Sequence, residues 1–327
     1  MTEHFRILVT GSGLVDEAQE YALSKRCVLE TGHSSDTAED LARRLKEFRP
    51  DGLIVRQGKI TAAVMDAASS LKVICKHGVG TENIDIDAAA SRGIPVMYTP
   101  DANFESVAQH SLAMILTLGR RITSQDRRIR RGLFDKRGYD GIELGDSTLG
   151  LIGFGRVARR LVELVEPLGI RVIAYHPSNR GDGSSSRVRS VESSDAVFSE
   201  SDFVSLHCPL TPTTTGLVDR RSLALMNPHS FLINTARGGL VVEADLVDAL
   251  KNDRLGGAAL DVFEVEPPVE DNPLFLLDNV VLTPHVAGSS DKSLLNMGRS
   301  AVDNVVAFLR GEAVDPGSVV DPSDFRA

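Results

Sequence analysis

Leu149-Gly150-Leu151-Ile152-Gly153-Phe154-Gly155-Arg156-Val157-Ala158 is the stretch of this chain that decides its fold. Its first four residues are typical of a buried parallel strand, and a helical pattern follows over 156–168. Gly153 would make the tight turn between the two, Gly155 would allow a ligand close to the backbone, and Ala158 stands where a third glycine often lies. The first amide groups of the helix would then point at a pyrophosphate. The stretch therefore predicts a dinucleotide-binding strand–turn–helix unit.

Strand-like and helix-like segments alternate along the chain, a pattern typical of α/β proteins with parallel sheets. In the first region, three strands are expected over 6–10, 51–55 and 71–75. A helix is expected over 36–48, with a cap at Ser35 or Asp36. Residues 178–190, which are rich in Ser, Gly and Arg, are expected to form an exposed loop. A second series predicts six strands, the full number of a Rossmann domain, over 148–152, 171–175, 202–207, 230–234, 257–260 and 279–282.

The composition is that of a soluble globular protein, and a length of 327 residues suggests about two domains. A net charge of −9 argues against nucleic acid as the main partner, because phosphate binding requires clustered positive charge. No apolar run approaches the roughly 18 residues needed to span a membrane, and the first residues do not resemble a signal peptide. Cys27, Cys75 and Cys208 are odd in number and widely spaced, so we expect reduced thiols, no metal site and a cytoplasmic location.

A run of arginines is the one feature that suggests nucleic-acid binding. Its members are Arg120, Arg121, Arg127, Arg128, Arg130 and Arg131. At helical spacing such charges usually form a solvated or subunit-facing surface, and Asp126 and Asp135 interrupt this run. We therefore expect no nucleic-acid partner.

Three phrases nearer the C-terminus place an Arg, a Glu and a His in order. They are Asn234-Thr235-Ala236-Arg237-Gly238, Asp261-Val262-Phe263-Glu264-Val265-Glu266-Pro267 and Thr283-Pro284-His285. An Arg can hold a carboxylate in two parallel hydrogen bonds, and a His beside a Glu can exchange a proton near neutral pH. With a hydride carrier bound to the upstream glycine motif, such groups suit the interconversion of a 2-hydroxy acid and a 2-keto acid.

In this order, the glycine motif and the three phrases resemble the D-isomer-specific 2-hydroxyacid dehydrogenase family over nearly the whole chain. The resemblance implies two Rossmann-like α/β domains with parallel sheets: a flavodoxin-like substrate domain and an NAD(P)-binding Rossmann domain. In the family the final helix, here 291–309, returns to the first domain. We therefore expect a discontinuous substrate domain, 1–100 plus 290–327, and a dinucleotide-binding domain over 101–289. A small ligand would bind in the cleft between them.

The same resemblance implies a role for each residue of the trio. Arg237 would bind the substrate carboxylate and help to polarise the keto oxygen. His285 would protonate that oxygen, and Glu266 would accept a hydrogen bond from the imidazole of His285. Glu264 is the alternative acid, but the family places its acid directly before the proline. Formate dehydrogenases of this fold carry Gln at that position, so Glu266 argues against formate.

Further site residues follow from the resemblance. Asp261 would orient the nicotinamide carboxamide. Val79 and Gly80, in the loop 77–85, would bind the substrate carboxylate through backbone amides, and Arg56 would face an anionic or hydroxylated substrate tail unless it lies in a solvated loop. The implied cofactor-binding positions are Gly153, Gly155, Arg156, Val157, His176, Ser178, Arg180, Cys208, Pro209, Thr214, Thr235, Ala236, Arg237, Asp261, His285 and Gly288.

The end of the second strand of the cofactor domain bears on the choice between NAD(H) and NADP(H). An NAD-binding unit normally places an Asp or Glu there to hold both ribose hydroxyls, whereas this chain has His176. Ser178 and Arg180 could bind a 2′-phosphate, so NADP(H) is slightly favoured. In the alternative, His176 caps the strand and the protein uses NAD(H) or both cofactors.

The main interpretation is a dehydrogenase that reduces a small 2-keto acid such as glyoxylate or hydroxypyruvate. Because the long helix after residue 103 meets a second subunit in the family, a homodimer is expected. A 3-phosphoglycerate dehydrogenase is the second interpretation. Many such enzymes carry a regulatory domain, for which we expect no room after about residue 311. A non-catalytic, dinucleotide-sensing corepressor, similar to the C-terminal-binding proteins, is the third. The long disordered flanks that would recruit its partners are not evident here.

Overall fold

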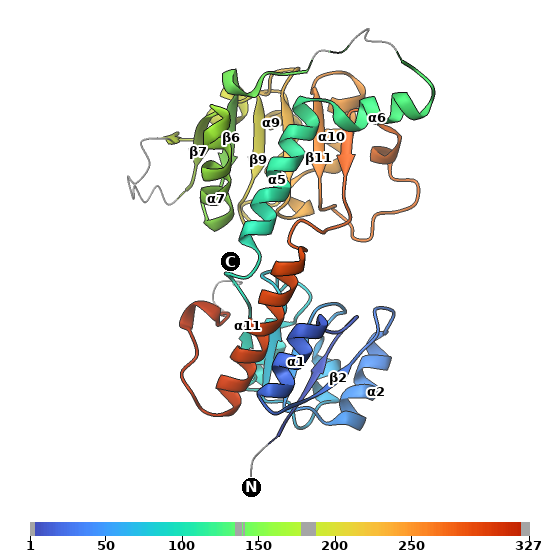
Figure 1. Cartoon of the computed structure of the whole chain (residues 1–327), viewed down its shortest axis with the longest axis vertical. Helices are drawn as coiled ribbons and strands as arrows, with labels where there is room; N and C mark the ends of the chain where they lie inside the picture. Colours follow the sequence, from blue (N-terminus) through green and yellow to red (C-terminus); the bar gives the residue numbers. More distant parts are fainter. Residues whose placement is uncertain (1–3, 135–138, 140, 178–187, 322–327) are drawn as a thin grey trace. The chain divides into compact units, whose positions relative to one another are not determined.

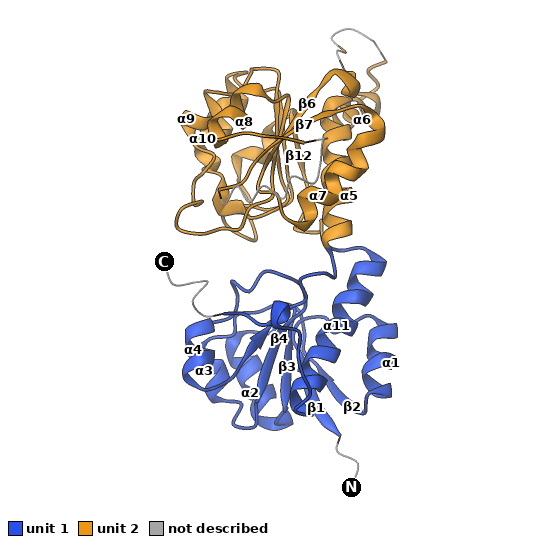
Figure 2. Ribbon diagram, turned by 90° about the vertical axis from the view of Figure 1, so that its left-hand side faces the viewer, with its two compact units in different colours: residues 1–103, 289–327 blue, residues 104–288 orange. Residues whose placement is uncertain are grey.

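The structure is a computed structural model, which describes residues 4–134, 139, 141–177 and 188–321. The chain forms two compact units (Figure 2). Unit 1 comprises residues 1–103 and 289–327, and unit 2 comprises residues 104–288. Each unit contains its own parallel β-sheet, which confirms the predicted α/β class with two Rossmann-like domains.

Within the described residues, the sheet of unit 1 has five strands in the flavodoxin-like order β2-β1-β3-β4-β5. The strands are β1 (Phe5–Val9), β2 (Cys27–Thr31), β3 (Gly52–Val55), β4 (Val73–Lys76) and β5 (Val96–Met97). The three predicted strands correspond to β1, β3 and β4. The sequence does not predict β2, which is mostly exposed or half-buried at the sheet edge, or β5, which has only two residues.

Helices cover both faces of this sheet. α1 and α11 lie side by side on one face (Figure 1), and α2, α3 and α4 pack on the other. Their bounds are α1 (Asp16–Ser24), α2 (Ala38–Phe48), α3 (Ala62–Asp66), α4 (Ile86–Ser91) and α11 (Asp291–Leu309). The predicted cap of α2 is wrong by one or two residues. Thr37 is the N-cap, because it forms a reciprocal capping box with Asp40.

Unit 2 contains a larger sheet in the order β12-β11-β10-β9-β6-β7-β8. Its strands are β6 (Thr148–Ile152), β7 (Arg171–Tyr175), β8 (Val188–Ser190), β9 (Phe203–Leu206), β10 (Phe231–Asn234), β11 (Gly257–Leu260) and β12 (Val280–Leu282). All six predicted strands are present, as β6, β7, β9, β10, β11 and β12, but the predicted number is too low by one, because the described residues form seven strands.

The additional strand, β8, occupies the last three residues of the segment predicted as a loop. It is a short edge strand with a half-buried valine and two exposed polar residues, so it has neither the length nor the apolar pattern of a buried strand. Parallel pairing with β7 orders it. The rest of the predicted loop, residues 178–187, lies outside the described residues.

Two helical layers enclose the sheet of unit 2. α5 and α7 pack on one face, and α8, α9 and α10 pack on the other. Their bounds are α5 (Phe104–Gly119), α7 (Arg156–Val165), α8 (Ser194–Glu200), α9 (Arg220–Leu223) and α10 (Glu243–Lys251). Short 3-10 helices span Leu144–Asp146, Glu166–Leu168, Gly238–Leu240, Pro273–Leu276 and Pro316–Ser318. The helix predicted over 156–168 is thus α7 followed by a 3-10 turn.

A further helix, α6 (Ile122–Arg130), follows α5 (Figure 1). It contains three of the six arginines of the run, Arg127, Arg128 and Arg130. No residue of α6 is buried. Arg130 pairs with Asp126 within the helix, and Arg127 pairs with Asp278, which precedes β12. Part of the positive charge is therefore balanced by carboxylates of unit 2 itself.

Parallel pairing places all strand carboxyl ends at one edge of each sheet, and the loops that leave this edge contain most of the predicted site residues. In unit 2 the chain changes direction across the sheet between β6 and its neighbour β9, which is where ligands bind in open α/β sheets. Among the described helices, none combines the length and the apolar character needed to cross a membrane.

Candidate active site

The predicted trio comes from three loops at the carboxyl edge of unit 2. Arg237 follows β10, Glu266 lies in the loop after β11, and His285 follows β12. These three strands are neighbours in the sheet, so residues far apart in the sequence meet at one edge. The geometry of the trio is therefore set by strand pairing.

His285 and Glu266 form a hydrogen-bonded pair. Nδ1 of His285 lies 2.7 Å from Oε2 of Glu266, whose Oε1 accepts a hydrogen bond of 3.0 Å from the backbone N–H of Phe263. Glu264, the alternative acid, instead accepts from the backbone N–H of Glu243. The structure thus brings Glu266, and not Glu264, to the imidazole.

The pair shifts the protonation of both members. The hydrogen bond from His285 to the Glu266 carboxylate raises the pKa of His285, although burial and the nearby Arg237 guanidinium oppose this shift. Burial alone would raise the pKa of Glu266, but hydrogen bonds from His285 and Phe263 outweigh it, and the pKa of the carboxyl is lowered. Because Nδ1 is engaged by Glu266, Nε2 is the nitrogen left to exchange a proton with a ligand.

The loop that carries Arg237 is held by Asn234, a fully buried residue at the end of β10. The Asn234 side chain accepts from the N–H of Ala236 at 3.0 Å and donates to the carbonyl of Arg237 at 2.9 Å. A β-carbon at Gly238 would lie 1.8 Å from the carbonyl oxygen of Phe263, so only glycine fits there. The sequence interpretation gave Asn234 no role, although a buried polar residue inside the phrase was the available signal.

Asp261, just after β11, organises the loop of His285. Its carboxylate accepts from the hydroxyl of Thr283 at 2.6 Å and from the N–H groups of Val286 and Ala287 at 2.8 and 2.7 Å. Its carbonyl accepts from the N–H of His285 at 2.8 Å. These bonds hold His285 at a φ of 54°, in the left-handed region that a residue other than glycine seldom adopts.

The glycine motif has a backbone suited to a pyrophosphate. Gly153 adopts a φ of 93°, and a β-carbon there would lie 2.5 Å from the carbonyl oxygen of His207. Gly155 is the N-cap of α7, makes no side-chain cap hydrogen bond, and has no atom within 4 Å of where a β-carbon would lie. A side chain at Gly155 would therefore meet open space at the start of a ten-residue helix, and a helix N-terminus favours an anionic group.

Other positions predicted to bind the cofactor also lie at this carboxyl edge. Arg156 and Val157 open α7, and His176 is exposed just after β7. Cys208 and Pro209 follow β9, and the hydroxyl of Thr214 donates to the carbonyl of Pro209 at 2.7 Å. Thr235 and Ala236 precede Arg237, and Gly288 is the last residue of unit 2. Ser178 and Arg180 lie outside the described residues.

The predicted substrate residues of the first region belong to unit 1. Arg56 follows β3, and its Nη1 donates to the carbonyl of Gly13 and to Oγ of Ser12 at 3.1 Å. Val79 and Gly80 lie in the loop after β4, where Val79 is exposed and Gly80 is half-buried. Arg56 therefore supports the loop after β1 within its own unit, whereas the trio is assembled entirely within unit 2.

Replacing Glu266 with Gln is expected to lower the pKa of His285. Gln keeps the hydrogen-bonding shape but removes the negative charge, while burial and Arg237 continue to disfavour the imidazolium. The pKa of His285 is measured by NMR titration of labelled histidine. The matched control, Glu264→Gln, should leave it unchanged, and an equal shift in both variants would contradict the assignment of Glu266.

Comparison with known proteins agrees with this geometry. Residues 112–287 match the family model described as "D-isomer specific 2-hydroxyacid dehydrogenase, NAD binding domain". A D-3-phosphoglycerate dehydrogenase of Methanocaldococcus jannaschii is 39% identical over 85% of the chain and 53% of that protein, so the chain spans about half the length of this relative. A hydroxypyruvate reductase of Thermotoga maritima is 37% identical over 78% of the chain and 83% of its own length.

A solved structure supports the same assignment. A protein of Thermus thermophilus, known from its crystal structure, is 34% identical, covers 97% of this chain and 100% of its own, and has a TM-score of 0.88. Unit 2 therefore carries a nicotinamide-dinucleotide-binding domain. The chain belongs to the D-isomer specific 2-hydroxyacid dehydrogenase family.

Proposed function

We propose that the protein reduces a small 2-keto acid, such as glyoxylate or hydroxypyruvate, to the corresponding D-2-hydroxy acid, with hydride from a nicotinamide cofactor. The observation that carries the proposal is the His285–Glu266 pair at the carboxyl edge of unit 2, with Arg237 near enough to influence both pKa values. An acid–base group and a carboxylate-binding cation are the two groups that this reaction needs from the protein.

Arg237 binds the substrate carboxylate in this proposal. A guanidinium offers paired donors that match the two carboxylate oxygens, and so fixes the orientation of the keto group. The two hydrogen bonds of the Asn234 side chain hold the backbone at Ala236 and Arg237, so the backbone that carries the guanidinium is fixed in position. Positioning of this kind reduces the entropy lost on reaching the transition state.

His285 supplies the proton. During reduction the Nε2 proton moves to the keto oxygen as the carbonyl carbon accepts hydride, and during oxidation the hydroxyl proton returns to Nε2. Glu266 holds Nδ1 and stabilises the imidazolium, so the histidine remains protonated at higher pH than an ordinary histidine. The same pair therefore serves both directions of the reaction.

The described residues fit a dinucleotide, which supplies the hydride when it is bound. The first amides of α7 would hold the pyrophosphate. The Asp261 carboxylate is 1% exposed and already accepts from Thr283, Val286 and Ala287, so it would accept from the nicotinamide carboxamide only through its remaining lone pair. For the adenosine ribose, we propose a slight preference for NADP(H). The exposed end of β7 carries His176, and no carboxylate follows it in the described Tyr175-His176-Pro177 segment to repel a 2′-phosphate.

The second candidate function is oxidation of 3-phosphoglycerate, a substrate that carries its own phosphate. Cationic side chains at adjacent strand ends of unit 1 favour this candidate: Arg56 follows β3, and Lys76 ends β4. Nζ of Lys76 lies 2.9 Å from Oδ1 of Asn83 and 3.3 Å from the carbonyl oxygen of Arg56. The non-catalytic corepressor is not favoured, because the chain is similar to a D-3-phosphoglycerate dehydrogenase and a hydroxypyruvate reductase, which are enzymes.

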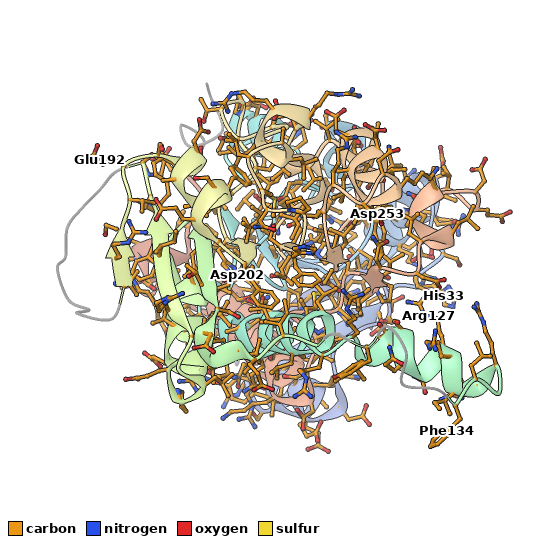
Figure 3. The ribbon with its side chains drawn as sticks, turned by 90° about the horizontal axis from the view of Figure 1, so that it is seen from above. His33, Arg127, Phe134, Glu192, Asp202 and Asp253 are labelled. Atoms are coloured by element: carbon orange, nitrogen blue, oxygen red, sulfur yellow. The ribbon has the colours of Figure 1, made fainter. Side chains whose placement is uncertain are left out.

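We further propose a homodimer that works in the cytoplasm. Apolar side chains lie exposed along α6 and just beyond it: Ile122 and Ile129 are each 54% exposed, and Phe134 is 90% exposed. Figure 3 shows Phe134 projecting outward beyond α6. A neighbouring subunit would remove this apolar area from water. The three free thiols suit a reducing compartment.

Initial rates with glyoxylate, hydroxypyruvate and 3-phosphohydroxypyruvate test the reaction. Reduction should be measurable with at least one of them, and His285→Ala should lower kcat by about 10²- to 10⁴-fold, the usual contribution of a general acid. Since the reduction needs protonated His285, kcat/KM should fall as pH rises through the raised pKa of His285, and oxidation should show the reverse trend.

The matched control for this experiment is His229→Ala, which removes an exposed histidine just before β10, at the amino edge of the same sheet. It should retain the wild-type rate. Binding of the cofactor without turnover of any of the three acids would overturn the proposed reaction and favour a sensing role. A strong preference for the phosphorylated acid would select the second candidate.

Replacing His176 with Asp is expected to lower kcat/KM for NADPH relative to NADH by about tenfold or more, because a carboxylate repels the 2′-phosphate and accepts from ribose hydroxyls. The shape-matched neutral control, His176→Asn, should change this ratio little. The measurement is the initial rate with each cofactor at saturating keto acid. An unchanged ratio in the Asp variant would show that His176 does not face the ribose.

The double substitution Ile129→Asp and Phe134→Asp should convert the dimer to a monomer, because it places two charges on the exposed apolar surface formed by α6 and the residues just beyond it. Sedimentation velocity measures the mass in solution. Leu225→Asp, which alters a partly exposed leucine elsewhere in unit 2, is the control and should remain dimeric. A monomeric wild-type protein would overturn the proposed homodimer.

A further inference from the structure

Helix α5 supplies two adjacent polar side chains to the loops of the candidate active site, and the sequence interpretation singled out neither. Nε2 of His110 lies 3.1 Å from Oγ1 of Thr283, in the loop after β12. Oγ of Ser111 lies 2.9 Å from Oγ1 of Thr235, in the loop after β10. All four residues belong to unit 2. The helix therefore contacts the loop of His285 through one side chain and the loop of Arg237 through the next.

The hydrogen bonds at Thr283 have a defined direction. Its hydroxyl donates its only hydrogen to Oδ1 of Asp261 at 2.6 Å, so its oxygen is left to accept from Nε2 of His110. The direction requires a proton on Nε2 of His110, in either the neutral or the charged imidazole. A continuous donor chain thus runs from His110 through Thr283 to Asp261.

Asp261 links Thr283 to the backbone around His285. Its carbonyl and carboxylate together receive the N–H groups of three consecutive residues, His285, Val286 and Ala287. The Asp261 side chain is only 1% exposed, so water cannot replace a lost partner without rearrangement. A tilt of this carboxylate would disturb the backbone at Val286 and Ala287, which directly follow His285, and so the position of the imidazole relative to Glu266.

We infer that His110 is a positioning residue, which acts through Thr283 and Asp261 to keep the His285 imidazole within hydrogen-bonding distance of the Glu266 carboxylate. His110 is 24% exposed, and its Nε2 remains 3.9 Å from Oδ1 of Asp261, so it acts on the carboxylate through the Thr283 hydroxyl. Without the donor, the Thr283 oxygen loses the bond that fixes its rotamer, and the hydroxyl can turn away from Asp261. The kinetic part of this inference rests on the proposed function, but the structural part does not.

Three variants test the inference. His110→Leu removes the donor and replaces it with an apolar side chain of moderate size. His110→Gln provides an amide N–H at a position similar to that of Nε2 of the histidine. Ser111→Ala removes a hydrogen bond from the adjacent position of the same helix, but to the other loop. The Gln variant therefore tests donor chemistry, and the Ala variant tests whether any disturbance of α5 has the same effect.

The first measurement is the pKa of His285 by NMR of labelled histidine, with the signal assigned by its absence in His285→Ala. His110→Leu should lower this pKa, because the imidazole of His285 moves away from the Glu266 carboxylate and their hydrogen bond weakens. His110→Gln and Ser111→Ala should leave it near the wild-type value. This readout needs no turnover, so it decides the inference even if the substrate has been misidentified.

The second measurement is steady-state reduction of the best keto acid. His110→Leu should lower kcat about tenfold with little change in KM, as expected when one hydrogen bond that supports the acid is lost. Ser111→Ala should instead act mainly on KM, through the loop of Arg237. The double variant His110→Leu/Thr283→Val should be no slower than Thr283→Val alone, because both changes break the same chain.

Two results would overturn the inference: a His285 pKa in His110→Gln that is as low as in His110→Leu, or rate losses at His110 and Thr283 that multiply. Failure of the proposed function gives a different pattern. In that case the wild-type protein reduces no 2-keto acid, while the NMR titrations still distinguish the Leu variant from the Gln and Ala variants and so support the positioning role.

Discussion

Parallel strand pairing is the constraint on which the rest of this structure depends. Because the paired strands of unit 2 run in one direction, each loop that leaves a strand carboxyl end emerges at the same edge. The loops after the neighbouring strands β10, β11 and β12 therefore bring Arg237, Glu266 and His285 to the same part of this edge. The glycine turn after β6 is delivered to the same edge, so the nucleotide-binding and acid–base groups share one scaffold.

Buried polar groups convert this approximate placement into defined geometry. Asn234 closes the loop of Arg237, and Asp261 gathers three backbone amides around His285. Each is almost fully buried at the end of a strand, where an unsatisfied polar atom would be costly, so the surrounding loop must satisfy it in one conformation. The unusual φ of His285 persists for this reason, because the bonds to Asp261 offset its backbone strain.

The sequence was most informative about features that depend on residues close together in the chain. The glycine turn, the alternation of strands and helices, and the acid directly before Pro267 each depend on residues close together in the chain, and the structure agrees with them. It was least informative at sheet edges. The short strands β5 and β8 have too few apolar residues to form a pattern, and they are ordered only by a neighbouring strand.

The sequence by itself determined the α/β class, the family and the identity of the ionisable groups, because these depend on residue type and on spacing along the chain. The resemblance favoured Glu266 over Glu264 by its place before Pro267, but only the tertiary structure makes the contact, because the loop after β11 directs Glu266 to His285 and Glu264 to the backbone of Glu243. The tertiary structure also joined His110 to Thr283, which are separated by 173 positions. No local pattern can encode such a contact, because it exists only once α5 has packed against the sheet.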